Sequence, residues 1–185
     1  DHLSETFSWQ DDKSYDKGKV LTAEQLDEVD VFGRYLDVDD DGICYRTLPG
    51  THPDKGAFFN RGTSRNHFAG YTEKSADYVD NMERLTKKFY SAINFLPEPE
   101  IQEGKKKAPI ALVYFGTSSH SIVEAIDQLH EQGLSTDTLR IKAFPFHQNI
   151  EQFIDEHSFN NGQVFVIEQN RDAQMKSLLV NELQI

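Results

Sequence analysis

The second half of the chain alternates blocks of apolar residues with polar turns, whereas the first half shows little such regularity. The apolar blocks are unbroken, which is typical of strands that are buried on both faces of a parallel sheet. Apolar residues at helical spacing follow each block, so a helix is expected after every strand. The predicted strands are residues 110–115, 138–144 and 163–168, and the helices carry Ile122 to Leu129, Ile150 to Ile154 and Met175 to Leu179.

The spacing of these strands predicts the fold class. The first two strands start about thirty residues apart, which is the length of a right-handed βαβ crossover. We therefore expect an α/β fold with a three-layer open parallel sheet, preceded by an irregular and partly helical extension. Three strands are few for such a sheet, so we expect the domain to be truncated, with at least one more strand beyond Ile185.

Two helices are predicted in the first half of the chain. Thr22 and Gln25 have the spacing of a capping box, which indicates a short helix to about Phe32. A longer helix with apolar residues at regular spacing is predicted, with Ser75 as its N-cap and Pro97 as its stop. Two further start signals belong to the second half: a capping box that begins at Ser121, and Asp172 as the cap of the last helix.

Between the two early helices, residues 46–72 are polar and rich in glycine and proline. Such a segment buries little by itself, so we expect it to be clamped against another domain or subunit. Residues 97–108 contain prolines, a glycine and a run of lysines, which is typical of a linker. The predicted division is therefore an extension over 1–96, a linker over 97–108 and an α/β domain over 109–185.

Composition narrows the classes of function. The net charge of −12 would repel a phosphate backbone, so a nucleic-acid partner is not expected. The single cysteine, Cys44, cannot by itself hold an iron–sulfur cluster or a structural zinc, and a chain without disulfides fits a reducing, cytoplasmic location. No apolar run approaches the ~20 residues that span a bilayer, so no membrane partner is expected.

One long motif resembles a known family. Residues 42–64 (GICYRTLPGTHPDKGAFFNRGTS) are similar to the alpha subunit of the 2-oxoacid:ferredoxin (acceptor) oxidoreductases, in the form that carries a fused gamma domain at its N-terminus. The overall likeness is to the 2-oxoglutarate branch, and pyruvate or branched-chain oxoacids stay open as substrates. Four shorter stretches agree with the family: residues 78–84, 114–117, 143–146 and 168–174.

The resemblance implies an enzyme that decarboxylates a 2-oxoacid on thiamine diphosphate, passes electrons through an iron–sulfur cluster to ferredoxin, and forms an acyl-CoA. Residues 1–96 would be the tail of the pyrimidine-binding domain, and residues 109–185 a domain like the C-terminal domain of transketolase. The diphosphate–magnesium motif and the cluster cysteines belong to the beta subunit in this family. The resemblance therefore implies no catalytic residue here, an inactive fragment, and a role in scaffolding and in contacts with the beta subunit and a second alpha subunit.

An acidic loop supports a hypothesis of another class. Asp37, Asp39 and Asp41 occupy the first, third and fifth positions of a calcium-binding loop. The twelfth position, which should be a glutamate, is Leu48. The alternatives are a calcium-tuned interaction module and an acidic turn in which the aspartates cap their own backbone.

Two further sets of residues are candidates for ligand binding. The segment Arg61-Gly-Thr63-Ser64-Arg65 could form a nest for a phosphate or carboxylate, such as that of coenzyme A, or its arginines could pair with carboxylates. The predicted strands end in polar residues at the edge where open α/β sheets bind ligands, which would suit either a small-ligand domain or an interface. The residues at those strand ends are Gly116, Thr117, Glu168 and Asn170.

Overall fold

The computed structural model describes residues 9, 14–56, 64–104 and 106–184. The chain divides into two compact units. We refer to them as the N-terminal unit, residues 8–94, and the C-terminal unit, residues 95–185, and describe each by itself.

The C-terminal unit contains a four-stranded sheet in the order β1-β3-β2-β4. Strands β2 (Ile110–Phe115), β3 (Thr136–Ile141) and β4 (Gln163–Ile167) are parallel, with β2 in the middle. Leu112 lies opposite Thr138 in β3 and Phe165 in β4. The α/β fold and its parallel strands were predicted from the unbroken apolar blocks, and both are confirmed.

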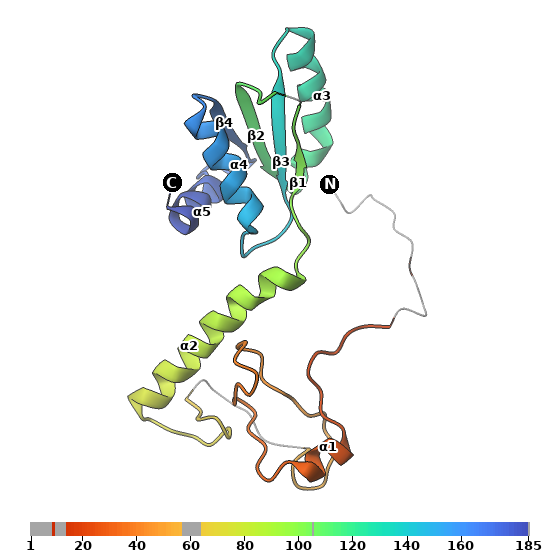
Figure 1. The fold of residues 1–185 in the computed structure, drawn as a ribbon, viewed down its shortest axis with the longest axis vertical. Helices are drawn as coiled ribbons and strands as arrows, with labels where there is room; N and C mark the ends of the chain where they lie inside the picture. Colours follow the sequence, from red (N-terminus) through yellow and green to blue (C-terminus); the bar gives the residue numbers. More distant parts are fainter. Residues whose placement is uncertain (1–8, 10–13, 57–63, 105, 185) are drawn as a thin grey trace. The chain divides into compact units, whose positions relative to one another are not determined.

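Helices cover both faces of this sheet, which makes the three layers (Figure 1). Helix α3 (Ser118–Glu131) packs on one face, where Ile122 meets Leu112 and Tyr114. Helices α4 (Gln148–Phe159) and α5 (Gln174–Leu183) pack on the other face. The core on that second face is formed by Ala111, Val113, Leu139, Ile141, Phe146, Ile150, Phe153, Ile154 and Leu179.

The sheet also contains a strand that the sequence did not predict. Strand β1 (Glu100–Gln102) pairs antiparallel with β3, inside the segment that was interpreted as a linker. All three of its residues are exposed, so it has no apolar pattern to reveal it. Glu100 instead forms ion pairs with Arg140, at 3.3 Å, and with Lys142, at 2.6 Å.

Two helix starts differ from the sequence prediction. Helix α3 begins at Ser118, because the chain turns at Gly116 with φ of +56° and enters the helix directly, so the predicted capping box at Ser121 is not at the helix start. Helix α5 begins at Gln174, and Asp172 does not cap it. Asp172 instead pairs with the neighbouring Arg171.

The N-terminal unit has two helices and long irregular segments. Helix α1 (Ala23–Glu28) is opened by the predicted capping box, in which Gln25 N–H donates to Thr22 Oγ1 at 3.3 Å and Thr22 N–H donates to Gln25 Oε1 at 2.9 Å. Helix α2 (Ser75–Ser91) continues into a short 3₁₀ turn, Ala92–Phe95. Its N-cap is Lys74, not the predicted Ser75, and no side chain caps it.

Polar contacts, more than an apolar core, hold the N-terminal unit together. Leu26 is the only buried apolar side chain among its described residues. The ammonium of Lys55 donates to the carbonyl of Leu26 at 2.8 Å and to that of Val29. The ring of His52 accepts the N–H of Lys55 at 3.0 Å and contacts Asp27 at 3.1 Å. Most of the described part of 46–72 is thus irregular, as predicted, and His52 and Lys55 within it contact α1.

Candidate functional site

The carboxyl ends of β2 and β4 meet at one edge of the sheet. These strands are neighbours, and the helices that follow them cover opposite faces of the sheet. The loop after β2 and the loop after β4 therefore lead to opposite faces. Such a switch point is where open α/β sheets bind ligands. Thr117 and Gln169 bridge it, with the Gln169 side-chain amide donating to Thr117 Oγ1 at 3.3 Å. The structure thus brings together two of the predicted strand ends.

Two of the predicted ligand residues at this edge are engaged in capping α5. The carboxylate of Glu168 accepts the N–H of Met175 at 3.0 Å and that of Lys176 at 3.2 Å. Asn170 donates to Glu168 and accepts the N–H of Gln174 at 3.1 Å. Burial would raise the pKa of Glu168, but these hydrogen bonds outweigh it and lower the pKa. Their first role is therefore to satisfy the exposed N–H groups at the start of the helix.

The acidic loop surrounds a lysine. Lys19 donates to Asp39 at 2.6 Å and to Asp41 at 2.8 and 2.9 Å. The carboxylate of Asp37 caps the loop by accepting the N–H of Asp41 at 3.1 Å and of Gly42 at 2.8 Å. Burial would lower the pKa of Lys19, but the two aspartates raise it, and Lys19 in turn lowers the pKa of both. The ammonium of Lys19 thus takes the place of a metal ion in this turn. Calcium binding by the loop stays a prediction.

Only part of the predicted anion nest can be located. Arg61 and Thr63 lie outside the described residues. Ser64 accepts the N–H of Thr72 through its carbonyl at 3.2 Å, and Arg65 pairs with Tyr71 in an antiparallel bridge. The guanidinium of Arg65 also donates to the carbonyl of Ala69 at 3.3 Å. The described half of the segment is thus a closed turn, and the nest stays a prediction.

One cluster in the C-terminal unit has the spacing of metal ligands. Oxygen and nitrogen atoms of Glu103, Asp137 and His157 lie within 4.8 Å of one another. The buried carboxylate of Asp137, however, already accepts the N–H of Gly104 at 3.0 Å and of Ala108 at 2.9 Å. The ring nitrogens of His157 are also engaged, with Asp137 at 2.9 Å and with the carbonyl of Phe153 at 2.7 Å. These contacts make the cluster a structural ion pair between β3 and α4.

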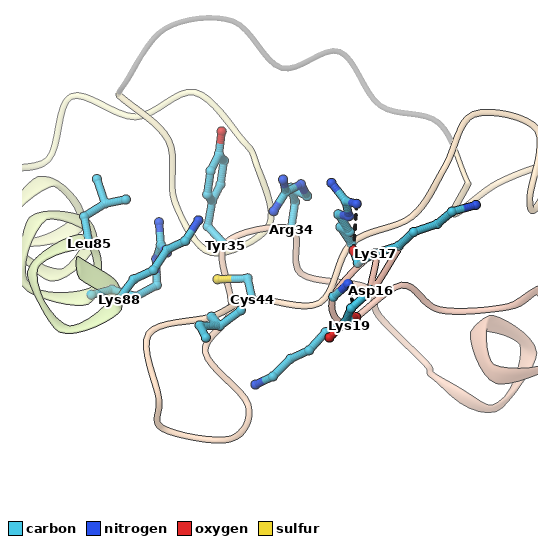
Figure 2. Close-up of a pocket in the computed structure, with 12 residues that line it drawn as sticks. Asp16, Lys17, Lys19, Arg34, Tyr35, Cys44, Leu85 and Lys88 are labelled. Atoms are coloured by element: carbon cyan, nitrogen blue, oxygen red, sulfur yellow. Dashed lines mark hydrogen bonds between the residues drawn. The ribbon is translucent and has the colours of Figure 1, made fainter. Parts of the chain in front are cut away.

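The sequence did not reveal a cationic cavity in the N-terminal unit. It encloses about 400 Å³ between helix α2, the segment around residue 17, residues 34–35 and the irregular segment 43–46. Figure 2 shows Tyr35, Arg34 and Cys44 between Leu85 and Lys88 on one side and Asp16, Lys17 and Lys19 on the other. Six of the lining residues are basic: Lys17, Lys19, Arg34, Arg46, Arg84 and Lys88. They come from four segments, so no local motif marks the cavity.

Cys44, the single cysteine of the chain, lines the same cavity and is partly buried. Burial raises the pKa of its thiol, and the nearby charges of Arg84, Arg34 and Lys88 lower the pKa by less than burial raises it. A thiol with a raised pKa is a poor nucleophile at neutral pH. We therefore interpret Cys44 as part of the wall of the cavity and not as a nucleophile.

No protein-family model matches the chain. None of the described helices is long and apolar enough to cross a bilayer. The solved structures similar to the chain include the following two. The first is a 2-oxoglutarate:ferredoxin oxidoreductase from Magnetococcus marinus, with 2-oxoglutarate, coenzyme A and succinyl-CoA bound, which matches with a TM-score of 0.69 and 18% identity over 82% of this chain.

The second is the alpha chain of a probable 2-oxoacid ferredoxin oxidoreductase from Thermoplasma acidophilum, with 27% identity over 48% of this chain and 73% of that one. Its TM-score of 0.29 adds nothing on the fold. The present chain spans 26% of the length of the Magnetococcus marinus chain. What the comparison establishes is the fold: the chain has the α/β fold found in part of a 2-oxoglutarate:ferredoxin oxidoreductase.

Proposed function

We propose that this chain is the C-terminal part of the alpha subunit of a thiamine diphosphate-dependent 2-oxoacid:ferredoxin oxidoreductase. The observation that carries the proposal is the likeness of fold to a 2-oxoglutarate:ferredoxin oxidoreductase over 82% of the chain. The motif at residues 42–64, which suggested the same family, supports it independently of the fold. The substrate we propose is 2-oxoglutarate, which in the cytoplasm would lose carbon dioxide, give two electrons to ferredoxin and combine with coenzyme A to form an acyl-CoA.

The cofactors would be bound mainly by other parts of the enzyme. Thiamine diphosphate needs a magnesium ion with free carboxylate and amide ligands, and an iron–sulfur cluster needs several thiolates. The described residues offer one thiol, Cys44, and one cluster with metal-ligand spacing, whose Asp137 and His157 are already hydrogen-bonded to protein. These residues do not fit either group, so we propose no catalytic step for this segment and expect it to be inactive alone.

The proposed role of the segment is scaffolding and subunit contact. Helix α2 presents apolar side chains to solvent: Tyr78 is 51% exposed, Val79 50% and Tyr90 53%. Together with Met82 and Thr86 they form a shallow, mostly apolar surface along α2, beside Glu83 and Lys87. Contiguous apolar surface of this kind is typical of an interaction site. We propose that the beta subunit covers it in the holoenzyme.

The enzymatic proposal is tested with the intact protein purified with its partner subunits. We expect coenzyme A-dependent reduction of ferredoxin or of a viologen dye with 2-oxoglutarate as substrate. Pyruvate and branched-chain 2-oxoacids are the comparison substrates. Preference for one of these would correct the substrate, and no reduction with any 2-oxoacid would overturn the proposed function.

The contact is tested separately by Val79→Asp, with Val123→Asp as its matched control. Val123 is 61% exposed on helix α3, so the control places the same charge on another exposed valine. We expect Val79→Asp to abolish co-purification of the beta subunit and Val123→Asp to leave it unchanged. If Val79→Asp still co-purifies with the beta subunit, the proposed contact is wrong. This holds even if the variant loses stability or alpha-subunit dimerisation.

A further inference from the structure

The cationic cavity stands out against the charge of the rest of the chain. The chain carries 31 acidic and 19 basic residues, so most cations should find an acidic partner nearby. Six of the basic residues nevertheless line this one cavity, and among the described residues Asp16 is the only acidic one in its wall. One carboxylate oxygen of Asp16, Oδ1, already accepts the N–H of Gly18 at 2.8 Å. The cavity therefore concentrates positive charge that its own wall does not neutralise.

The partners of the six cations show which of them are available. Lys19 is paired with Asp39 and Asp41. Arg46 donates to the carbonyl of Lys17 at 2.7 Å. Three further side chains of the wall, Lys17, Arg34 and Lys88, form no hydrogen bond with the described residues. None of the three pairs with a carboxylate of the described residues either. Apart from Lys19, the cations of the wall are thus not paired with a carboxylate of the described residues, and three of them have no hydrogen bond there either.

The arginines are held in place although they lack an anion. Arg84 donates to the carbonyl of Gly42 at 3.1 Å and to Asn81 at 2.7 Å, while its Nε is buried and finds no acceptor among the described residues. The guanidinium groups of Arg34 and Arg84 lie 5.8 and 5.7 Å from the centre of the Tyr35 ring. A buried donor without an acceptor costs free energy unless a partner supplies one.

The wall also has an apolar part, formed by Ile43 and Leu85 beside the ring of Tyr35. A guanidinium binds phosphate or carboxylate oxygens through two parallel hydrogen bonds, and lysines add charge without fixed geometry. Three unpaired cations match the two or three charges of a phosphate ester or diphosphate better than the single charge of a carboxylate. We propose that this cavity binds a small molecule that carries phosphate groups, with its apolar portion against Tyr35 and Leu85.

This inference does not depend on the proposed function, because it is tested by binding and not by turnover. Inorganic pyrophosphate is titrated calorimetrically into the intact protein, with inorganic phosphate and the tricarboxylate tricarballylate as comparison probes at constant ionic strength. We expect pyrophosphate to bind at least tenfold more tightly than tricarballylate. Equal or tighter binding of tricarballylate would overturn the phosphate assignment, and the absence of binding by all three would overturn the site.

A pair of double variants locates the binding. Arg34→Gln with Lys88→Gln removes two of the unpaired cations, and we expect at least a tenfold loss of pyrophosphate affinity. Arg171→Gln with Lys176→Gln makes the same change of charge at exposed positions of the C-terminal unit, and affinity should stay within twofold of the unmodified protein. Equal losses in both double variants would show a general charge effect and overturn the assignment.

Cys44 supplies a second readout in the cavity itself. Its alkylation by iodoacetamide can be followed by mass spectrometry of the peptide that contains it. We expect saturating pyrophosphate to slow the alkylation at least threefold in the unmodified protein, and to have no effect in the Arg34→Gln, Lys88→Gln variant. Alkylation that is unchanged by a bound probe would place the probe outside this cavity and overturn the proposal.

Discussion

The Nε2 atom of His157 lies 2.9 Å from Oδ2 of Asp137, and both side chains are only 1% exposed. The other ring nitrogen of His157 lies 2.7 Å from the carbonyl oxygen of Phe153. Both partners are acceptors, and only the imidazolium form of histidine has two N–H donors. The pair is therefore a buried ion pair, and the two amide donors on Asp137 complete its hydrogen bonding.

We expect Asp137→Asn to destabilise the C-terminal unit strongly. The substitution leaves the buried His157 without its counter-charge, which typically costs about 3–5 kcal/mol of unfolding free energy. Urea unfolding followed by circular dichroism measures the change. Glu156→Gln is the control. Glu156 lies on α4, the helix of His157, and pairs with Lys107 at the surface, so this substitution should have a small effect. Similar losses in the two variants would contradict the role given to the buried pair.

The same pair predicts a dependence on acid. Burial alone would raise the pKa of Asp137, but the amide groups of Ala108 and Gly104 and the ring of His157 lower it below its ordinary value of 3.8. The unfolded chain therefore takes up this proton first, so the stability due to Asp137 is present above pH 3.8 and is lost as pH falls through the folded pKa. The difference in urea midpoint between the unmodified protein and Asp137→Asn should shrink from pH 5 to pH 3, the range in which Asp137 titrates. A constant difference would contradict this.

Substitution by alanine is expected to destabilise the protein more at Gly42 than at Gly50. Both have positive φ, +79° and +83°, but a Cβ at Gly42 would lie 2.3 Å from the backbone nitrogen of Lys88, whereas nothing lies within 4 Å at Gly50. Gly50→Ala should cost about 1–2 kcal/mol from the backbone conformation alone. Gly42→Ala should cost about 1–3 kcal/mol more, because the loop must move away from α2. Equal urea midpoints for the two variants would show that the loop does not pack against the helix in this way.

The structure and the sequence prediction assign different residues to the cap of α5. Glu168→Ala should cost about 0.5–2 kcal/mol, as the loss of a helix cap does, and should speed amide hydrogen exchange at Met175 and Lys176. Asp172→Ala, the change at the cap expected from sequence, should leave the exchange at these amides unaltered. Faster exchange in Asp172→Ala than in Glu168→Ala would restore the original assignment.

Calcium binding by the acidic loop is also open to direct measurement. Because the ammonium of Lys19 lies among the carboxylates of Asp39 and Asp41, we expect no calorimetric heat from micromolar calcium. Lys19→Met removes the ammonium and is the variant in which any latent affinity would appear. Micromolar binding by the unmodified protein would contradict the structural role of Lys19 and revive the calcium hypothesis.

Sequence patterns predicted the fold where side-chain burial is regular. Strand β2 was predicted with its observed bounds because all its central residues are apolar and buried. Strand β1 was missed because it is short and exposed, and it is recognisable only by its pairing with β3. The cap of α5 was misassigned because the capping residue, Glu168, lies at the end of the preceding strand and reaches the helix across a turn.

The candidate sites were harder to predict because their residues come from separate segments of the sequence. Thr117 was expected at the ligand edge of the sheet, and its contact with Gln169 places it there. The cationic cavity, by contrast, is assembled from segments that are separate in sequence, such as those of Lys17, Arg34 and Lys88. Spacing along the chain carries no information about such a cluster, whereas the three-dimensional contacts of α2 bring it together.

The scarcity of buried apolar residues in the N-terminal unit has a consequence for the life of the protein in the cell. A region whose described interior holds one leucine gains little free energy by folding alone. Its lifetime should then follow the supply of whatever covers it, since newly made chains that find no companion would open often and be degraded. Such a dependence would keep the amounts of the interacting polypeptides balanced without any separate control of their synthesis.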